Sequence, residues 1–387
     1  MTTTAWADRI ATATPPDRER VIDGLRVIAM LGVVAGHWLV TGLTTGTGGE
    51  LHQASPLTAI PGLTPLTWVL QTLGLFFFVA GNTAARGLDR AGRRGGSTRS
   101  WLAGRARRLL PPIVVFLGVW LLILAALRHT AIGPWTLHTA GTIAFSPLWF
   151  VLVLVLLLPL TPPVLGAVDR FGAAAALLPL GALIAMDALR YWLWPGMPGW
   201  PAYLNCVTAW LVPYTLGAAA SRGRLAGERC GRGLLLAGLT SGALLIAAGY
   251  PASLVGVPGD GRSNLNPPSL LTAALSAVQI GLALLLWARL ERRLHRPGWW
   301  AVVGGLNLTA MTIFLWHQSA LFGVAGLGHV LGSDPVGLIG SPDSAGWIGH
   351  RLLWLPVVAV ALIVLCLLFR RAESFGAGDG SRSLAHR

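Results

Sequence analysis

The stretch RVIDGLRVIAMLGVVAGHWLV, residues 20–40, decides how the rest of the chain is interpreted. Its length matches the roughly 20 mostly apolar residues that a helix needs to cross a bilayer. Beyond Arg20 and Asp23 near its start, two further ionisable residues, Arg26 and His37, interrupt the apolar pattern. Placing such groups inside a membrane is costly, so they mark a functional site by default. The stretch therefore predicts a first membrane helix that also carries chemistry.

Arg26 and His37 lie on one face of that helix. They are eleven residues apart, which at 100° per residue is three turns plus about 20°, with a rise of about 16 Å. That rise is far beyond hydrogen-bond reach, so we expect Arg26 and His37 to act at two separate positions along one groove. Arg26, near the cytoplasmic end, would hold a phosphate or carboxylate, and His37, in the outer half, would act as a general base. The alternative is a histidine bonded to a neighbouring helix and an arginine extended to lipid headgroups.

The composition predicts an all-α, polytopic integral membrane protein. Hydrophobic residues make up 54% of the 387-residue chain and charged residues only 11%, whereas soluble domains have about 25% charged residues. About ten apolar runs are long enough to span a bilayer. They cover residues 22–43, 63–82, 109–128, 146–163, 171–190, 201–220, 233–250, 268–290, 299–325 and 348–369.

Arginine placement predicts the orientation of these spans, because cytoplasmic loops carry the excess of basic residues. With both termini cytoplasmic, the outer segments hold only Arg128, Arg190, Arg262 and Arg351. We expect a cytoplasmic segment 1–21, a single transmembrane domain 22–370 and a disordered cytoplasmic tail 371–387. The predicted location is the plasma membrane.

Two other classes are not favoured by the composition. A net charge of +14 would suit nucleic-acid binding in a soluble protein, but these arginines fall between apolar runs and we expect no nucleic acid. Cys206, Cys230 and Cys366 have no metal-ligand spacing, so we expect no metal.

A second polar group lies in LNLTAMTIFLWHQSALF, residues 306–322. On the inferred topology His317 lies at a depth similar to that of His37, and the two histidines could bound one cavity. Asn307 adds an amide to the same predicted helix. The alternative is structural, since such side chains commonly form hydrogen bonds between membrane helices.

The segment RARRLLPP, residues 105–112, lies at the predicted cytoplasmic entrance of the third span, where a helix is expected to start. Arg105, Arg107 and Arg108 would form an anion site suited to the phosphates of a nucleotide cofactor. Binding of anionic lipid is the competing explanation. Trp149, followed by another aromatic residue, is a weaker candidate that an interfacial aromatic belt also explains.

Together these segments resemble acyltransferase family 3, membrane proteins that acylate surface glycans, other exported glycans and some macrolides. The resemblance covers nearly the whole chain, and its five motifs occur in the family's order. They are Ile22-Asp23-Gly24-Leu25-Arg26 with His37, Phe77 to Gly81, Arg105 with Arg108 and Pro111, Trp149-Phe150, and Phe314-Leu315-Trp316-His317. Ala80 stands where the family usually has serine.

The resemblance implies that Arg26 and His37 form the essential pair and that Arg105 and Arg108 sit at the acyl-donor site. It also implies transfer of an acyl group, acetyl or another short chain, from acyl-CoA in the cytoplasm. The acceptor would be a hydroxyl of a carbohydrate or macrolide-like molecule of the cell envelope. We expect no hydrolase domain after the transmembrane domain, so an acyl relay to such a domain would need a separate extracytoplasmic partner.

Two alternatives come from other classes. A transporter would suit the intramembrane polar groups and broken helices, although no inverted repeat is evident. A structural or lipid-binding membrane protein would use its arginines only to set topology.

Overall fold

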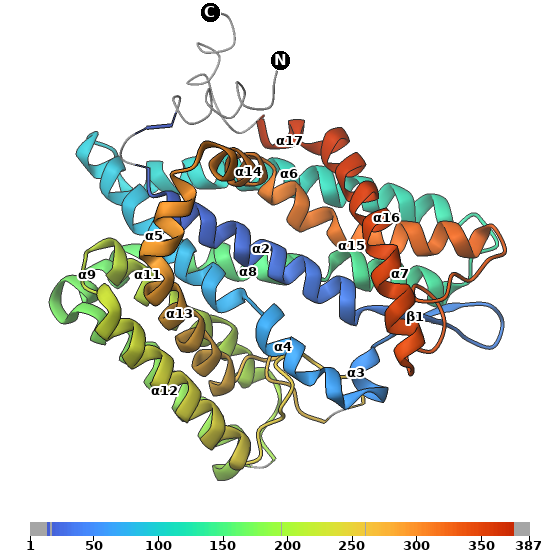
Figure 1. The fold of residues 1–387 in the computed structure, drawn as a ribbon, viewed down its shortest axis with the longest axis horizontal. Coiled ribbons are helices and arrows are strands. Elements are labelled where there is room, and N and C mark those ends of the chain that lie inside the picture. The colour runs from blue at the N-terminus through green and yellow to red at the C-terminus, as the bar shows by residue number, and fades with distance from the viewer. Residues whose placement is uncertain (1–13, 16–17, 195, 260, 375–387) are drawn as a thin grey trace, which may run out of the picture.

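The computed structural model describes residues 14–15, 18–194, 196–259 and 261–374. The described part is almost entirely helical (Figure 1). The helices of the first half are α2 (Arg20–Val40), α3 (Pro56–Ala59), α4 (Thr64–Leu70), α5 (Leu73–Arg93), α6 (Thr98–Leu127), α7 (Pro134–Phe145), α8 (Leu148–Leu157), α9 (Thr161–Phe171) and α10 (Leu177–Ala188). Those of the second half are α11 (Asn205–Ser221), α12 (Gly227–Ala247), α13 (Leu270–Leu294), α14 (Pro297–Leu308), α15 (Ala310–Val330), α16 (Ala345–Phe369) and α17 (Arg371–Ser374).

Within the described ranges, eight helical segments are long and apolar enough to cross a membrane. The sequence predicts about ten spans, and the difference has two sources. Predicted spans 146–163 and 171–190 both fall within one continuous segment, Pro134–Leu193. Predicted span 201–220 corresponds to α11, which has only 17 residues. The multi-span helical class is confirmed, whereas the count of ten and the cytoplasmic termini stay predictions.

Helix α2 lies at the centre of the bundle (Figure 1). It packs against α5, α13, α14 and α15, so its apolar residues form part of four hydrophobic clusters. Two ends of the bundle are named for convenience. The arginine end is where α2 begins at Arg20 and α16 ends at Phe369, and the hairpin end is where α2 ends at Val40.

Helices α5 and α11 pack with their backbones in contact because small residues face each other. A Cβ atom at Gly81 would overlap the carbonyl oxygen of Tyr214, and one at Gly217 would overlap that of Phe78. Close helix contacts of this kind are typical where glycine removes the side chain. This packing fixes α5, whose other face lines the candidate site.

Three predicted spans have different boundaries or breaks in the structure. Helix α6 begins at Thr98, with Ser97 as its N-cap, and not near residue 109, because Pro111 and Pro112 are accommodated inside the helix. Predicted span 299–325 is two helices, α14 and α15, which break at Thr309. Predicted span 63–82 is similarly divided between α4 and α5.

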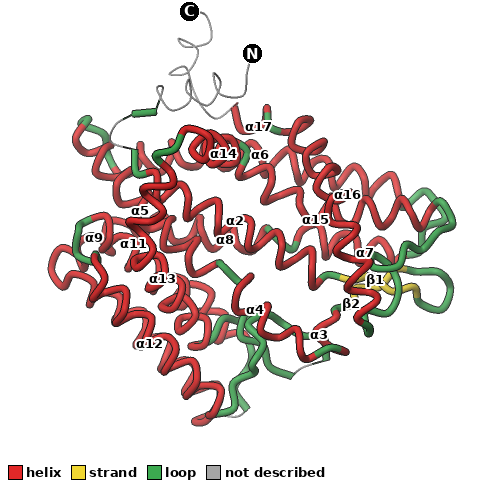
Figure 2. The backbone as a smooth tube through the Cα atoms, in the orientation of Figure 1, coloured by secondary structure: helices red, strands yellow, loops and turns green. Residues whose placement is uncertain are grey.

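A small β-hairpin, absent from the all-α prediction, lies at the hairpin end (Figure 2). Strands β1 (Gly42–Thr45) and β2 (Leu51–Ala54) pair antiparallel, with Gly42 opposite Ala54. The hairpin follows directly after α2. Its Gly48 and Gly49 both have positive φ, a conformation that glycine adopts without strain, and so they allow the tight turn.

Regarding the predicted tail 371–387, Arg371–Ser374 form α17. Residues 375–387 and most of the predicted segment 1–21, namely 1–13 and 16–17, lie outside the described residues.

Candidate active site

Three guanidinium groups come together at the arginine end. Arg26 of α2 and Arg105 and Arg108 of α6 line one cavity of about 190 Å³. Arg105 and Arg108 are three residues apart in a helix and therefore share a face. Arg107 is exposed and does not line this cavity. Ala80 does line it, so a serine there would place its hydroxyl beside the same arginines.

Arg26 is held by two neighbours. Its Nη1 lies 3.2 Å from Oδ1 of Asp23, which is one helical turn earlier, and donates a hydrogen bond to Oδ1 of Asn307 at 3.2 Å. The Asn307 amide in turn donates to the carbonyl oxygen of Asp23 at 3.1 Å. The structure thus brings Asn307 of α14 onto Arg26. A buried carboxylate and an amide fix the direction of this guanidinium.

Arg105 is held by α5 and by its own helix. Its Nη2 donates to the carbonyl oxygen of Thr83 at 3.1 Å, and its guanidinium lies 5.7 Å from the ring centre of Trp101. Arg108 is exposed at the cavity edge. The prediction that Arg108 stands at a helix start is wrong, because α6 has run for ten residues before it. The positive charge at this cavity therefore comes from the guanidinium groups and not from the N-terminus of α6, which lies earlier in the chain, at Thr98.

His37 contacts His317 directly. The Nε2 atom of His317 lies 3.0 Å from Nδ1 of His37, and the Nδ1 atom of His317 lies 2.7 Å from the carbonyl oxygen of Phe314. Trp38 additionally donates to the carbonyl oxygen of His317 at 2.9 Å. His317 is fully buried, whereas His37 is partly exposed to a cavity.

These hydrogen bonds assign the proton positions of the neutral pair. A carbonyl oxygen can only accept, so Nδ1 of His317 carries a hydrogen and its Nε2 has the lone pair. That lone pair can accept only from a protonated Nδ1 of His37. The Nε2 atom of His37 is then left unprotonated, which is the form that a general base requires.

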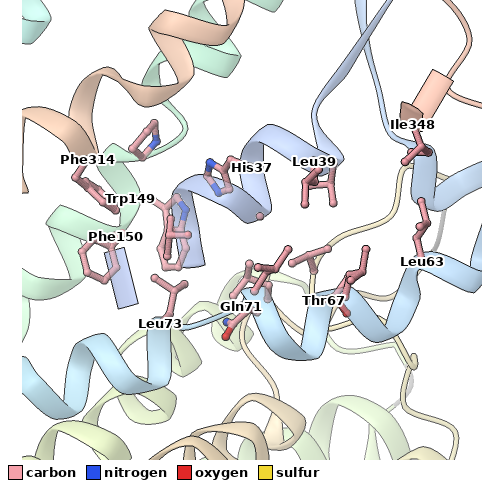
Figure 3. Close-up of a pocket in the computed structure, with 18 residues that line it drawn as sticks. His37, Leu39, Leu63, Thr67, Gln71, Leu73, Trp149, Phe150, Phe314 and Ile348 are labelled. Carbon is pink, nitrogen blue, oxygen red and sulfur yellow. The ribbon is translucent and has the colours of Figure 1, made fainter. Parts of the chain in front are cut away.

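The His37 cavity lies towards the hairpin end and has a volume of about 100 Å³ (Figure 3). Trp149 and Phe150 of α8 line it from one side, and Thr67 and Gln71 from another. Most other lining side chains are aliphatic, so the local dielectric constant is low and polar interactions within the cavity are strengthened. The structure therefore places Trp149 beside His37 and not only at a membrane interface.

An aromatic partition, defined as Phe76, Phe150 and Phe314, separates the two cavities. The ring centre of Phe76 lies 4.6 Å from that of Phe150 and 6.5 Å from that of Phe314. Phe76 lines the arginine cavity, whereas Phe150 and Phe314 line the His37 cavity. The expectation of one continuous groove is therefore wrong for this conformation, because three side chains from α5, α8 and α15 fill the space between its stations.

Sequence reasoning did not single out three residues that hold the site together. Asp23 forms ion pairs with Arg26 and, at 2.6 Å, with Arg18.

Glu373 of α17 accepts a hydrogen bond from the backbone N–H of Thr312 at 2.7 Å. Thr312 lies in the first turn of α15, the helix that carries His317. Arg351 is buried and donates to the carbonyl oxygen of Thr41, the C-cap of α2. The sequence offered a signal for Asp23 alone, because an acidic residue three positions before Arg26 lies one helical turn from it. Glu373 and Arg351 are distant in sequence from the residues that they contact.

The long apolar helices are those of a multi-pass membrane protein. Residues 20–371, nearly the whole chain, match the model of acyltransferase family 3, which is described as an acyltransferase domain. The chain belongs to this family and is a membrane acyltransferase. No match was found among curated proteins or solved structures.

Proposed function

We propose that the protein transfers a short acyl group, with acetyl as the first candidate, from acyl-CoA to a hydroxyl of a carbohydrate or macrolide-like acceptor. The single observation that carries this proposal is the pair of His37 and His317. Its hydrogen bonds leave one imidazole nitrogen of His37 free as a base beside a mostly apolar cavity.

The arginine cavity is the proposed binding site for the phosphates of CoA. Arg26, Arg105 and Arg108 supply three positive charges to one cavity, and guanidinium groups bind phosphate with two parallel hydrogen bonds. Under the predicted topology this cavity faces the cytoplasm, where acyl-CoA is available. The linear pantetheine arm would then extend along α2 towards His37, across the aromatic partition.

In the proposed reaction, Nε2 of His37 takes the proton of the acceptor hydroxyl as its oxygen attacks the thioester carbonyl. The tetrahedral intermediate collapses, the carbon–sulfur bond breaks and an ester forms. The CoA thiolate leaves and receives the proton back from His37, so the enzyme returns to its starting state. His317 keeps the His37 ring oriented and stabilises it while Nε2 carries the proton.

The direct test is acyl transfer by purified protein in lipid nanodiscs. Release of free CoA thiol is measured with acetyl-CoA and a panel of sugars and macrolides, and the ester product is identified by mass spectrometry. His37→Ala should lower turnover by about 10²- to 10⁴-fold, the usual contribution of a general base. His138→Ala is the matched control, because His138 is exposed and lies on α7, which contributes no lining residue to the cavity.

Full turnover by a normally folded His37→Ala protein would exclude the proposed chemistry. Movement of an unmodified acceptor across a proteoliposome membrane, without thiol release, would support the transporter alternative.

A further inference from the structure

A third and larger cavity lies away from the candidate active site. It has a volume of about 1180 Å³ and is bounded by α6, α7 and α15, with the turn of the β-hairpin at its mouth. It shares no lining residue with the His37 cavity or the arginine cavity. Figure 1 shows these helices and β1 together at one side of the bundle.

The walls of this cavity are apolar over most of its length. Trp316 and Leu365 line its deep part, and Leu327 and Val330 line it near the mouth. From residue 316 to residue 330, α15 rises about 21 Å. That length is close to the depth of one bilayer leaflet with its headgroups, about 20 Å. The small residues Gly323 and Gly326 keep the α15 wall open.

As far as the structure describes the chain, the lining of this cavity includes one carboxylate, that of Glu50, and no arginine. His329 is bonded through both ring nitrogens, to Asp334 at 2.6 Å and to the carbonyl oxygen of Gly49 at 3.1 Å. The carboxylate of Asp334 therefore already has a partner. Glu50 also lines the mouth and packs against Gly133, the N-cap of α7. Among the described residues, its carboxylate makes no ion pair or side-chain hydrogen bond that would neutralise it.

We propose that this cavity is a phospholipid-binding site that selects a lipid with an ammonium headgroup. The hydrocarbon chain would lie along α15 between Trp316 and Val330, and the ammonium group would pair with Glu50. A lipid with an anionic headgroup would instead place its charge beside an unneutralised carboxylate. The proposal is independent of the acyl-transfer reaction, since it uses neither His37 nor the arginine cavity.

The test uses photoreactive phosphatidylethanolamine and phosphatidylglycerol with identical diazirine-bearing chains. Each is incorporated at equal amounts into nanodiscs with the full-length protein, and crosslinked peptides are mapped by mass spectrometry. We expect phosphatidylethanolamine to label the α15 peptide roughly threefold more than phosphatidylglycerol, the size of effect typical of a solvent-accessible ion pair. Glu50→Gln should bring the two lipids to equal labelling.

Gly323→Leu should reduce labelling of α15 by both lipids severalfold, because the new side chain would project from α15 into the space proposed for the hydrocarbon chain. A Cβ atom at Gly323 meets no neighbour within 4 Å, so the substitution need not disturb packing. Gly181→Leu is the matched control, since Gly181 on α10 is equally open and far from the cavity. Thermal unfolding of each variant checks its fold.

Equal labelling of the wild type by both lipids would overturn the headgroup selectivity. Unchanged labelling of a folded Gly323→Leu protein would overturn the site itself. Because no arm depends on turnover, an inactive protein would leave this test intact.

Discussion

The imidazole of His317 lies 3.0 Å from the imidazole of His37, and its other nitrogen is fixed by the carbonyl oxygen of Phe314. In the proposed mechanism, His317 would take the place that a carboxylate has in many catalytic triads, where the carboxylate orients the base by a hydrogen bond. Unlike a carboxylate, a neutral imidazole carries no charge, which suits a site buried among apolar helices.

We expect His317→Ala to lower turnover by about 100-fold while leaving the Michaelis constant for acyl-CoA unchanged. Without its partner, the His37 ring can rotate or adopt the wrong tautomer. His317→Gln should retain more activity, since a glutamine side-chain oxygen can accept the hydrogen bond from Nδ1 of His37. Steady-state kinetics on both variants check this. If His317→Gln and His317→Ala lose turnover equally, His317 has a packing role instead.

The arginine cavity predicts a defect in donor binding. Arg105→Ala and Arg26→Ala should each raise the Michaelis constant for acyl-CoA by about tenfold or more, the value of one charge-assisted hydrogen bond. Arg107→Ala is the matched control, because Arg107 is exposed on the same helix but outside the cavity. An equal effect of all three substitutions would favour a general electrostatic role at the membrane surface.

The aromatic partition predicts that the size of residue 76 controls passage between the cavities. Phe76→Trp should lower turnover severalfold without weakening acyl-CoA binding, because the arginine cavity stays intact while the route to His37 narrows. Phe76→Ala should increase thioester hydrolysis in the absence of acceptor. Phe171→Trp, an exposed position on α9, controls for the added ring. Parallel loss of binding and turnover in Phe76→Trp would contradict this role.

Glu373 predicts a pH dependence of stability. Burial raises the pKa of its carboxyl above the ordinary 4.5, and hydrogen bonds from Thr312 oppose this only in part. The folded state therefore holds a proton more readily than the unfolded state, so this contribution to stability is present near pH 4.5 and is lost as pH rises through the raised pKa. Glu373→Gln, which does not titrate, should gain in thermal stability relative to the wild type between pH 4.5 and 8.

Melting curves across that range check the prediction, with Glu228→Gln as the control on an exposed ion pair. A constant difference between the Glu373→Gln protein and the wild type at every pH would contradict it.

The sequence by itself determined the membrane-spanning class, the family and the chemical types at the site. These follow from local properties, since apolar run length is set by bilayer thickness and the spacing of Arg26 and His37 by helical geometry. Arg105 and Arg108 could be predicted to face the same site because residues three positions apart lie on one face of a helix.

Only the tertiary structure decided which residues meet. The contact of His37 with His317 joins positions 280 residues apart, and that of Arg26 with Asn307 joins positions 281 apart. Such pairs depend on how α2, α14 and α15 pack, and no local periodicity encodes helix packing. The aromatic partition arises for the same reason, since side chains from α5, α8 and α15 compete for one buried volume.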